Sequence, residues 1–224
     1  MILTHLQRLI GGIYDLGVGY DVYDFLVTDR RTLPAQVRHR RTHEDLIISE
    51  PATAQPHEPG AEMAVSLYLD SGLIERLQRE DPTVRLHEGN VADCWEALEG
   101  ISHFLCVAWH AAHDRPVSIL ELELQAEVDK YVASYWLLRR QDPGRFPAEL
   151  HRLLFERTHI DAASAEGRED LYRLASRYAG RYCRRLEREL RRARTGPEDA
   201  VLAQLRRFYR LSGLRKRAHI DALH

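Results

Sequence analysis

Residues 171–193 read LYRLASRYAGRYCRRLERELRRA, and this stretch decides the architecture of the C-terminal part of the chain. Six arginines recur in it at steps of 4, 4, 3, 4 and 3 residues, which places them on one face of an α-helix. They are Arg173, Arg177, Arg181, Arg184, Arg188 and Arg191, the arginine stripe. The stripe extends over about 27 Å at ~1.5 Å per residue, so the sequence predicts a long helix over residues 167–194.

An apolar face accompanies the arginine stripe on the same predicted helix. It consists of Leu171, Tyr178, Tyr182, Leu186, Leu190 and Ala193. A helix with one apolar and one cationic side packs its apolar side against a core. The C-terminal part of the chain is therefore expected to be built from packed helices.

Further helices are predicted from the same periodicity and from start and stop signals. Asp70 or Ser71, Asn90 and Ser118 stand where an N-cap residue is expected. TGP at 195–197 supplies a glycine stop and a proline start between the last two helices. The further predicted helices span residues 71–81, 91–113, 118–140, 147–157 and 198–218.

The N-terminal part of the chain carries strand patterns. Residues 63–70, MAVSLYLD, alternate in the manner of a half-buried strand. Residues 21–29 and 45–50 are rich in the residue types that favour strands. Three strands within about fifty residues indicate a small antiparallel sheet. Residues 3–15 are compatible with a short helix or a strand, and the proline-rich residues 51–60 are expected to form a loop.

These patterns predict an α+β fold, with a small N-terminal antiparallel sheet followed by a predominantly α-helical bundle. Residues 1–85 are expected to form an α+β region with about three strands, and residues 86–224 a helical region of about five helices. No clean linker separates them, which favours one continuous globular unit. The stretch ILELELQ at 119–125 alternates as a strand would, but its continuation to Tyr131 exceeds the usual strand length and favours a helix.

The composition limits the class of protein. The chain has 224 residues, of which 44% are hydrophobic and 29% charged, so it is long and apolar enough to form a hydrophobic core. Cys94, Cys106 and Cys183 are far apart and odd in number, so a reducing cytoplasm is expected and a disulfide framework is not. The sequence has no apolar run of about 18 residues and no signal-peptide pattern, so we expect no membrane span.

Charge is unevenly distributed along the chain. Residues 166–224 contain 16 basic and 8 acidic residues, a net +8, whereas residues 1–165 carry a net −10. This asymmetry suits a polyanionic partner of the C-terminal part, and it equally suits docking of the basic part on the acidic part. Of the 32 basic residues 30 are arginines, a bias that GC-rich bacterial genomes produce, so the positions of the arginines are more informative than their identity.

A second stripe combines histidines and carboxylates on the predicted helix 91–113. It consists of Glu96, Glu99, His103, Cys106, His110 and His113, at steps of 3, 4, 3, 4 and 3 residues. The next helix adds Glu123 and Glu127, which repel each other at this spacing unless Lys130 or a metal ion lies nearby. Histidine and glutamate side chains that face each other between helices form the metal sites of helical bundles.

Two interpretations of the histidine–carboxylate stripe remain open. In one, a divalent transition metal is bound between helices 91–113 and 118–140, with His103, His110 and Glu127 as leading ligands. The full candidate set is Glu99, His103, His110, His113, Glu123 and Glu127. In the other, the stripe is the solvated side of an amphipathic helix, and its C-terminal histidines interact with the helix dipole. The sequence contains neither HExxH nor two Glu-x-x-His pairs, which would have favoured the metal.

Two functions follow from these patterns. The leading expectation is a non-enzymatic interaction or regulatory protein of the bacterial cytoplasm, which uses its basic helical C-terminal part. A protein is the expected partner of the arginine stripe, and nucleic acid or another polyanion is also compatible. A homodimer is compatible with exposed apolar helix surface. The alternative is a metal-dependent enzyme with a His/Glu site. The phosphate-binding loop, the dinucleotide-binding motif and the serine-hydrolase elbow are absent.

Overall fold

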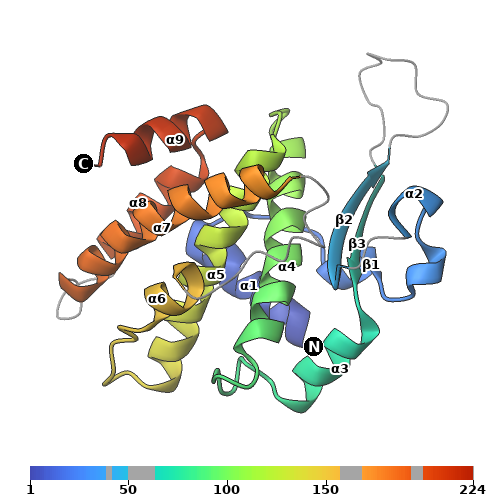
Figure 1. Cartoon of the computed structure of the whole chain (residues 1–224), viewed down its shortest axis with the longest axis horizontal. Coiled ribbons are helices and arrows are strands. Elements are labelled where there is room, and N and C mark those ends of the chain that lie inside the picture. Colours follow the sequence, from blue (N-terminus) through green and yellow to red (C-terminus); the bar gives the residue numbers. More distant parts are fainter. Residues whose placement is uncertain (39–41, 50–63, 157–167, 193–198, 224) are drawn as a thin grey trace.

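The computed structural model describes residues 1–38, 42–49, 64–156, 168–192 and 199–223. Within them a small sheet lies at one side of a larger helical body, so the predicted α+β class is confirmed (Figure 1). The helices are α1 (Ile2–Tyr14), α2 (Ala35–Arg38), α3 (Ser71–Arg79), α4 (Val91–Ala111), α5 (Ile119–Gln141), α6 (Leu150–Phe155), α7 (Glu169–Arg192), α8 (Asp199–Tyr209) and α9 (Gly213–Asp221). The strands are β1 (Leu26–Val27), β2 (Glu44–Ser49) and β3 (Ala64–Leu69).

Helices α4 and α5 form the centre of the molecule. Helix α5 contacts α1, α4, α6 and α7, and most of its side chains from Glu121 to Leu137 are buried. Its N-cap is Ser118, whose hydroxyl accepts a hydrogen bond from the backbone N–H of Glu121 at 3.2 Å. Residues 119–125 are therefore helical, and their apparent alternation arises because α5 buries side chains on more than one side.

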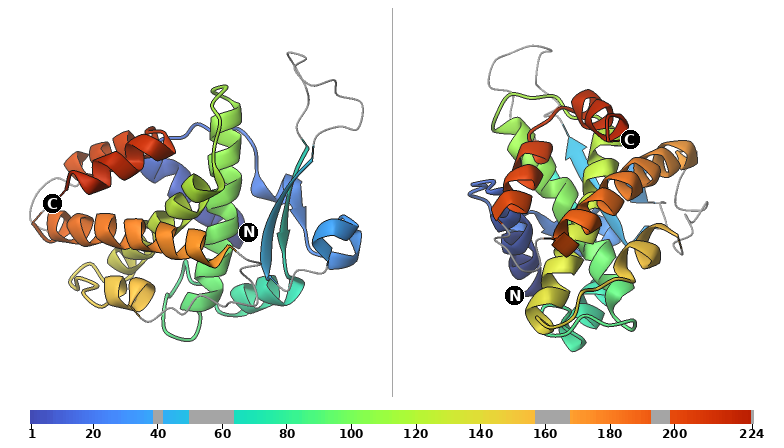
Figure 2. Two further views of the ribbon diagram at one scale, coloured as in Figure 1. Left: turned by 45° about the horizontal axis from the view of Figure 1, so that its top comes forward. Right: turned by 90° about the vertical axis from the view of Figure 1, so that its left-hand side faces the viewer.

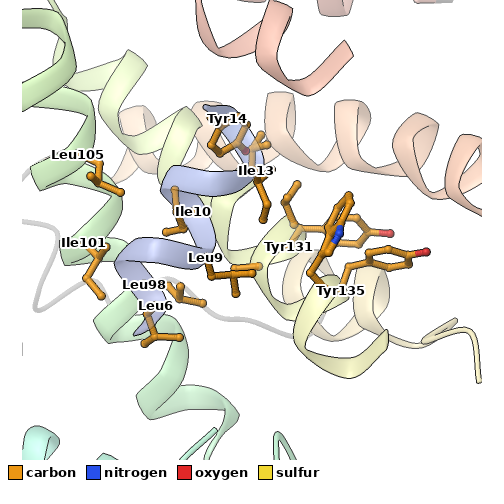
Figure 3. Packing of buried hydrophobic residues seen from close by; sticks show 14 of the residues in the cluster. Leu6, Leu9, Ile10, Ile13, Tyr14, Leu98, Ile101, Leu105, Tyr131 and Tyr135 are labelled. Carbon is orange, nitrogen blue, oxygen red and sulfur yellow. The ribbon is translucent and has the colours of Figure 1, made fainter. Parts of the chain in front are cut away.

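Helix α1 packs on this central pair. Its apolar side chains Leu6, Ile10 and Ile13 point towards α4 and α5, where they meet Leu98 and Ile101 (Figure 3). The helical option for residues 3–15 is therefore correct. Helix α1 also contacts α8, so the N-terminal helix and a C-terminal helix share one hydrophobic core.

The sheet has the strand order β1-β3-β2 and is mixed rather than antiparallel. Strands β2 and β3 pair antiparallel, with Leu46 opposite Leu67, but β1 pairs parallel to β3. The expectation of a purely antiparallel sheet is therefore wrong for β1. The predicted strand 21–29 is reduced to two residues because the Asp21 carboxylate accepts a hydrogen bond from the Tyr23 N–H at 3.0 Å and starts a 3-10 turn, Val22–Phe25.

Helix α4 lies between the sheet and the other central helix, α5 (Figure 2). Its backbone approaches the sheet closely at Gly100, where an added Cβ would lie 2.8 Å from Glu44 Cγ and 2.9 Å from Leu67 Cδ1. A glycine is therefore required at this crossing. The close approach also brings the first residue of β2, Glu44, against the middle of α4.

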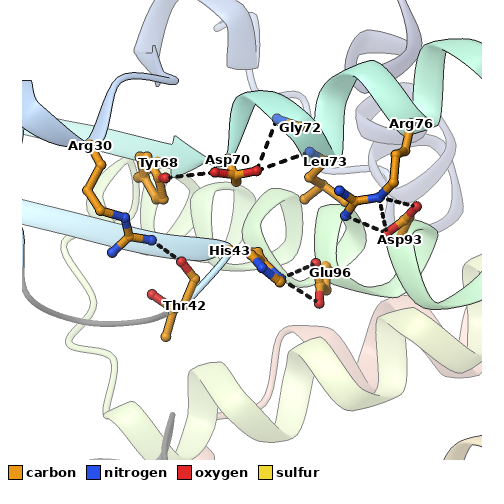
Figure 4. Close-up of polar contacts among 10 residues, drawn as sticks. All are labelled: Arg30, Thr42, His43, Tyr68, Asp70, Gly72, Leu73, Arg76, Asp93 and Glu96. Atoms are coloured by element: carbon orange, nitrogen blue, oxygen red, sulfur yellow. Dashed lines mark hydrogen bonds and ion pairs between the residues drawn. The ribbon is translucent and has the colours of Figure 1, made fainter.

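The end of the sheet is attached to α3 and α4 by polar contacts (Figure 4). Asp70 follows β3 and caps α3 by accepting hydrogen bonds from the N–H groups of Gly72 and Leu73. Arg76 on α3 then forms an ion pair with Asp93 on α4 at 2.8 Å. Of the two predicted caps of this helix, Asp70 is the one used.

Helix α7 has the predicted two-sided character. Its buried residues are Ala175, Ala179, Tyr182, Cys183, Leu186 and Leu190. The predicted apolar residue Ala193 and the break at 195–197 lie outside the described residues. None of the described helices combines the length and apolar character needed to cross a membrane.

The predicted helix 198–218 is wrong in one respect, because the chain turns at residues 210–212 and forms α8 and α9. The cause is a buried carboxylate. Glu121 Oε2 accepts a hydrogen bond from the Gly213 N–H at 2.9 Å, and Glu121 Oε1 lies 3.1 Å from the fully buried Lys216 Nζ. In an uninterrupted helix the Gly213 N–H would bond the carbonyl oxygen of Tyr209 and would not be available to Glu121.

A second buried carboxylate joins α1, α4 and α5. Asp129 accepts hydrogen bonds from Tyr14 Oη and Ser102 Oγ, both at 2.6 Å, and from Gln125 Nε2 at 2.8 Å. Its exposed fraction is 1%. Burial raises the pKa of Asp129 from 3.8 to about 6, although the three donors act in the opposite direction.

Asp129 should make folding stability fall as the pH rises. Because the pKa of Asp129 is higher in the folded state, its contribution to the free energy of unfolding is complete below pH 3.8. This contribution is lost as the pH rises through about 6. The shift corresponds to about 3 kcal/mol at ~1.4 kcal/mol per pKa unit. Urea unfolding of the wild type and of Asp129→Asn between pH 4 and 7 should give a stability difference that changes by that order. A constant difference would show that Asp129 is ionised throughout.

Candidate metal centre

His103 lies between two carboxylates that come from different elements. It projects from the middle of α4, and its side chain is 8% exposed. Its Nδ1 lies 3.2 Å from Oε1 of Glu44 on β2, and its Nε2 lies 3.6 Å from Oε2 of Glu123 on α5. Burial opposes protonation of His103, but Glu123 and Glu44 outweigh it and hold the pKa of the imidazole well above its ordinary value.

Glu99 lies one helical turn before His103, and Lys130 binds it. Lys130 Nζ is 2.9 Å from Glu99 Oε2 and also forms an ion pair with Glu127. Lys130 therefore supplies the cation that the Glu123–Glu127 spacing requires. Burial would raise the pKa of Glu99, but Lys130 and His103 lower it below the ordinary value.

The cluster contains more carboxyl groups than cations. Glu44, Glu99, Glu123 and Glu127 face His103 and Lys130, and these six side chains are between 8% and 29% exposed. Burial raises the pKa of Glu44 to about 7, although the adjacent His103 acts against the shift. Burial also raises the pKa of Glu127. With every group ionised, the cluster would carry an excess of two negative charges.

Three of these side chains converge in the manner of metal ligands. Glu99, His103 and Glu123 each present one ligand atom, and the three atoms lie within 4.8 Å of one another. Ligand atoms that share a zinc ion at about 2.0–2.2 Å are themselves roughly 3–4 Å apart. Shifts of about 1 Å, which side-chain rotation provides, would bring the three atoms to that separation.

The surrounding groups orient these three side chains. A carboxylate on the second nitrogen of a metal-binding histidine fixes the tautomer and the ring orientation, and Glu44 occupies this position at Nδ1. His103 Nε2 is left facing Glu123 and makes no hydrogen bond within the described part of the chain. Lys130 holds Glu99 in the same supporting role. One imidazole and two carboxylates suit manganese, iron or zinc.

The other members of the histidine–carboxylate stripe lie in different surroundings. His110 is buried, with Nδ1 2.8 Å from the Cys106 carbonyl oxygen and Nε2 3.6 Å from Glu121 Oε1. His113 is exposed and stacks on Trp109 at 4.3 Å. Glu96 forms an ion pair with His43, beside the attachment of the sheet (Figure 4).

The structure thus divides the six predicted metal ligands into separate groups. Glu99, His103 and Glu123 converge, Glu127 is held beside them by Lys130, and His110 and His113 have other partners. The solvated-face interpretation does not hold for the middle of the stripe, because His103, Cys106 and His110 are buried.

Glu44 is the member of the cluster that sequence reasoning missed. It is 59 residues from His103 in the chain, and the contact depends on the position of β2. One signal pointed towards it. Gly100 is the one glycine of the predicted helix 91–113 and lies one turn before His103, and a glycine inside a helix can mark a close approach of another element.

The arginine stripe is placed on one side of α7, as predicted. Arg173, Arg177, Arg184, Arg188 and Arg191 are exposed and Arg181 is partly exposed. Four of the six form ion pairs with nearby carboxylates, and Arg191 also lies over the Phe146 ring at 4.3 Å. The stripe is therefore partly neutralised within the chain.

No model of a known protein family, no curated protein and no solved structure matches this chain.

Proposed function

We propose that this chain binds a divalent transition metal through Glu99, His103 and Glu123, and that it acts as a metal-dependent enzyme. The observation that carries the proposal is that one ligand atom from each of these three side chains lies within 4.8 Å of the others, at a buried histidine whose Nε2 is 3.6 Å from Glu123 Oε2. A cluster of acidic residues alone would not be enough to propose a metal site. A buried histidine aimed at two carboxylates, with a third carboxylate behind it, is the arrangement that metal sites use.

Charge balance supports the same proposal. A carboxylate buried without a counter-charge is costly, and this cluster has two more carboxyl groups than cations. A divalent ion that replaced the proton on His103 Nε2 would reduce the excess of the fully ionised cluster from two negative charges to one. Glu44 and Lys130 would remain where they are, behind His103 and Glu99.

The number of protein ligands favours catalysis over a purely structural role. Structural zinc sites are closed by four protein ligands, whereas catalytic sites use three and leave a position for water or substrate. The Glu99 side chain is 29% exposed, so the edge of the cluster near it faces solvent. A metal held by Glu99, His103 and Glu123 would supply Lewis-acid chemistry at this edge, and Glu127 is a nearby carboxylate that would serve as a proton acceptor.

The interaction protein expected from the sequence remains the second candidate. The exposed arginines of α7 favour it, because Arg177 and Arg188 have no ion-pair partner among the described residues. A protein partner, a homodimer and a bacterial cytoplasmic location remain predictions.

Metal content tests the proposal directly. Untagged protein dialysed against Mn²⁺, Fe²⁺ or Zn²⁺ and then against metal-free buffer should retain about one equivalent by elemental mass spectrometry. His103→Ala and Glu123→Gln should each lose it, because each removes a ligand. His113→Ala is the matched control and should retain the metal, since His113 is exposed in the turn that follows the same helix. Equal retention in His103→Ala and the wild type would exclude this centre.

Glu44→Gln should weaken the metal without abolishing it. Glu44 contacts Nδ1 of the ligand His103 but is not one of the three converging side chains, and loss of such supporting groups typically costs about 10–100-fold in affinity. Titration against a competing chelator measures this factor. An unchanged affinity would show that Glu44 does not orient the imidazole, and a complete loss would make Glu44 a ligand.

Gly100→Ala should impair both stability and metal binding. The new methyl group would meet Glu44 Cγ and Leu67 Cδ1 below 3.0 Å, and overpacking of this kind costs about 1–3 kcal/mol. Displacement of Glu44 should also lower metal affinity. Gly12→Ala is the control, because Gly12 is helical and nothing lies within 4 Å of its added Cβ. Equal stability and metal affinity in the two variants would contradict the close approach at Gly100.

A further inference from the structure

A groove of about 520 Å³ lies along the arginine face of α7, between α6 and the C-terminal α9. The arginines that line it are Arg173, Arg177, Arg181, Arg184, Arg185 and Arg188. Glu156 is the one acidic residue of the described lining. The groove is separate from the proposed metal centre, since none of Glu99, His103 and Glu123 lines it.

The ion pairs around the groove leave part of its positive charge uncompensated. Arg181 pairs with Asp221 at 3.0 Å, and Arg184 pairs with Glu156 at 2.7 Å. Arg177 and Arg188 form neither an ion pair nor a hydrogen bond with any other described residue. Arg177 lies one helical turn from Arg181, and Arg188 one turn from Arg184. Like charges at this spacing repel, so an anion bound within either pair would be stabilising.

The other wall of the groove is apolar and firmly placed. Phe155, Ile220 and Leu223 form it, from α6 and the C-terminal segment. Gly180 lets α6 approach α7, because an added Cβ would lie 3.3 Å from Phe155 Cγ. The Gly180 carbonyl oxygen also accepts a hydrogen bond from His151 Nε2 at 2.8 Å. The helices therefore hold Phe155 opposite the arginines.

We propose that this groove binds a small ligand with two or more phosphate groups and an aromatic part, the chemical class of the nucleoside di- and triphosphates. A single guanidinium group can bind two phosphate oxygens at once, and neither Arg177 nor Arg188 has another partner among the described residues. The base would lie against Phe155. The volume falls within the roughly 300–1,000 Å³ of pockets for small molecules.

A small ligand fits these observations better than a nucleic-acid strand. Glu187 and Glu189 lie on the same helix as the arginine stripe, and Glu187 neutralises Arg191 at one end. Single-strand binding surfaces interleave aromatic platforms along a basic track. The described lining of the groove contains one phenyl ring, that of Phe155, and the Phe146 ring under Arg191 lies outside the groove.

Calorimetric titration with ATP, pyrophosphate and inorganic phosphate in buffer containing EDTA tests the proposal without involving the metal centre. The groove variant is Arg177→Gln with Arg188→Gln. The control variant is Arg192→Gln with Arg207→Gln, which removes the same charge from exposed positions of α7 and α8 outside the groove. We expect ATP to bind the wild type and the control alike, and the groove variant at least tenfold more weakly.

Other results would overturn the proposal. Failure of ATP to bind the wild type would do so, as would equal weakening in both variants, which would reveal only a general charge effect. Equal affinity for ATP and inorganic phosphate would exclude a role for Phe155. Binding of a 20-nucleotide single-stranded RNA that ATP does not displace would assign the groove to nucleic acid instead. Thermal unfolding of both variants confirms that each remains folded.

Discussion

Carboxylates buried along α5 have to find partners, and this requirement connects the elements of the fold. Glu121 is bound by Lys216 of α9, Glu123 by His103 of α4, and Asp129 by Tyr14 of α1. An unpaired buried carboxylate would cost several kcal/mol, so each partner element is held in a specific position. The same requirement explains why the chain turns between α8 and α9. The hydrophobic core stabilises the packing, while these polar contacts determine which helix packs where.

The proposed metal centre differs from the other buried carboxylate sites in its charge balance. Asp129 is satisfied by three neutral donors, and Glu121 is flanked by Lys216 and His110. The cluster at His103 has a surplus of carboxyl groups, and one ligand atom each of Glu99, His103 and Glu123 lie within 4.8 Å of one another. Helix α4 thus carries two different histidines: His110 has a structural role, and His103 has surroundings suited to a metal. They differ because Glu44 of β2 and Glu123 of α5 face His103, whereas Glu121 of α5 faces His110.

Local patterns predicted most of the helices and the two-sided nature of α7, because periodicity and caps are properties of neighbouring residues. They also identified the faces that bear Glu99, His103 and Glu123. Three features were beyond local reasoning. The parallel pairing of β1, the turn between α8 and α9, and the contact of Glu44 with His103 all depend on residues distant in sequence. Periodicity also could not distinguish His103 from His110, since both occupy the same helical stripe and only their distant partners differ.

The scarcity of lysine has a practical consequence. The chain contains two lysines, and both are described: Lys216 is fully buried, and the Lys130 side chain is 10% exposed and bound between two carboxylates. The surface charge is carried instead by guanidinium groups, which do not react with amine-specific reagents. In the folded protein such reagents would therefore reach the N-terminal amine almost exclusively. Labelling of either lysine would report opening of the interior, with Lys216 reporting release of α9 and Lys130 reporting disruption of the carboxylate cluster.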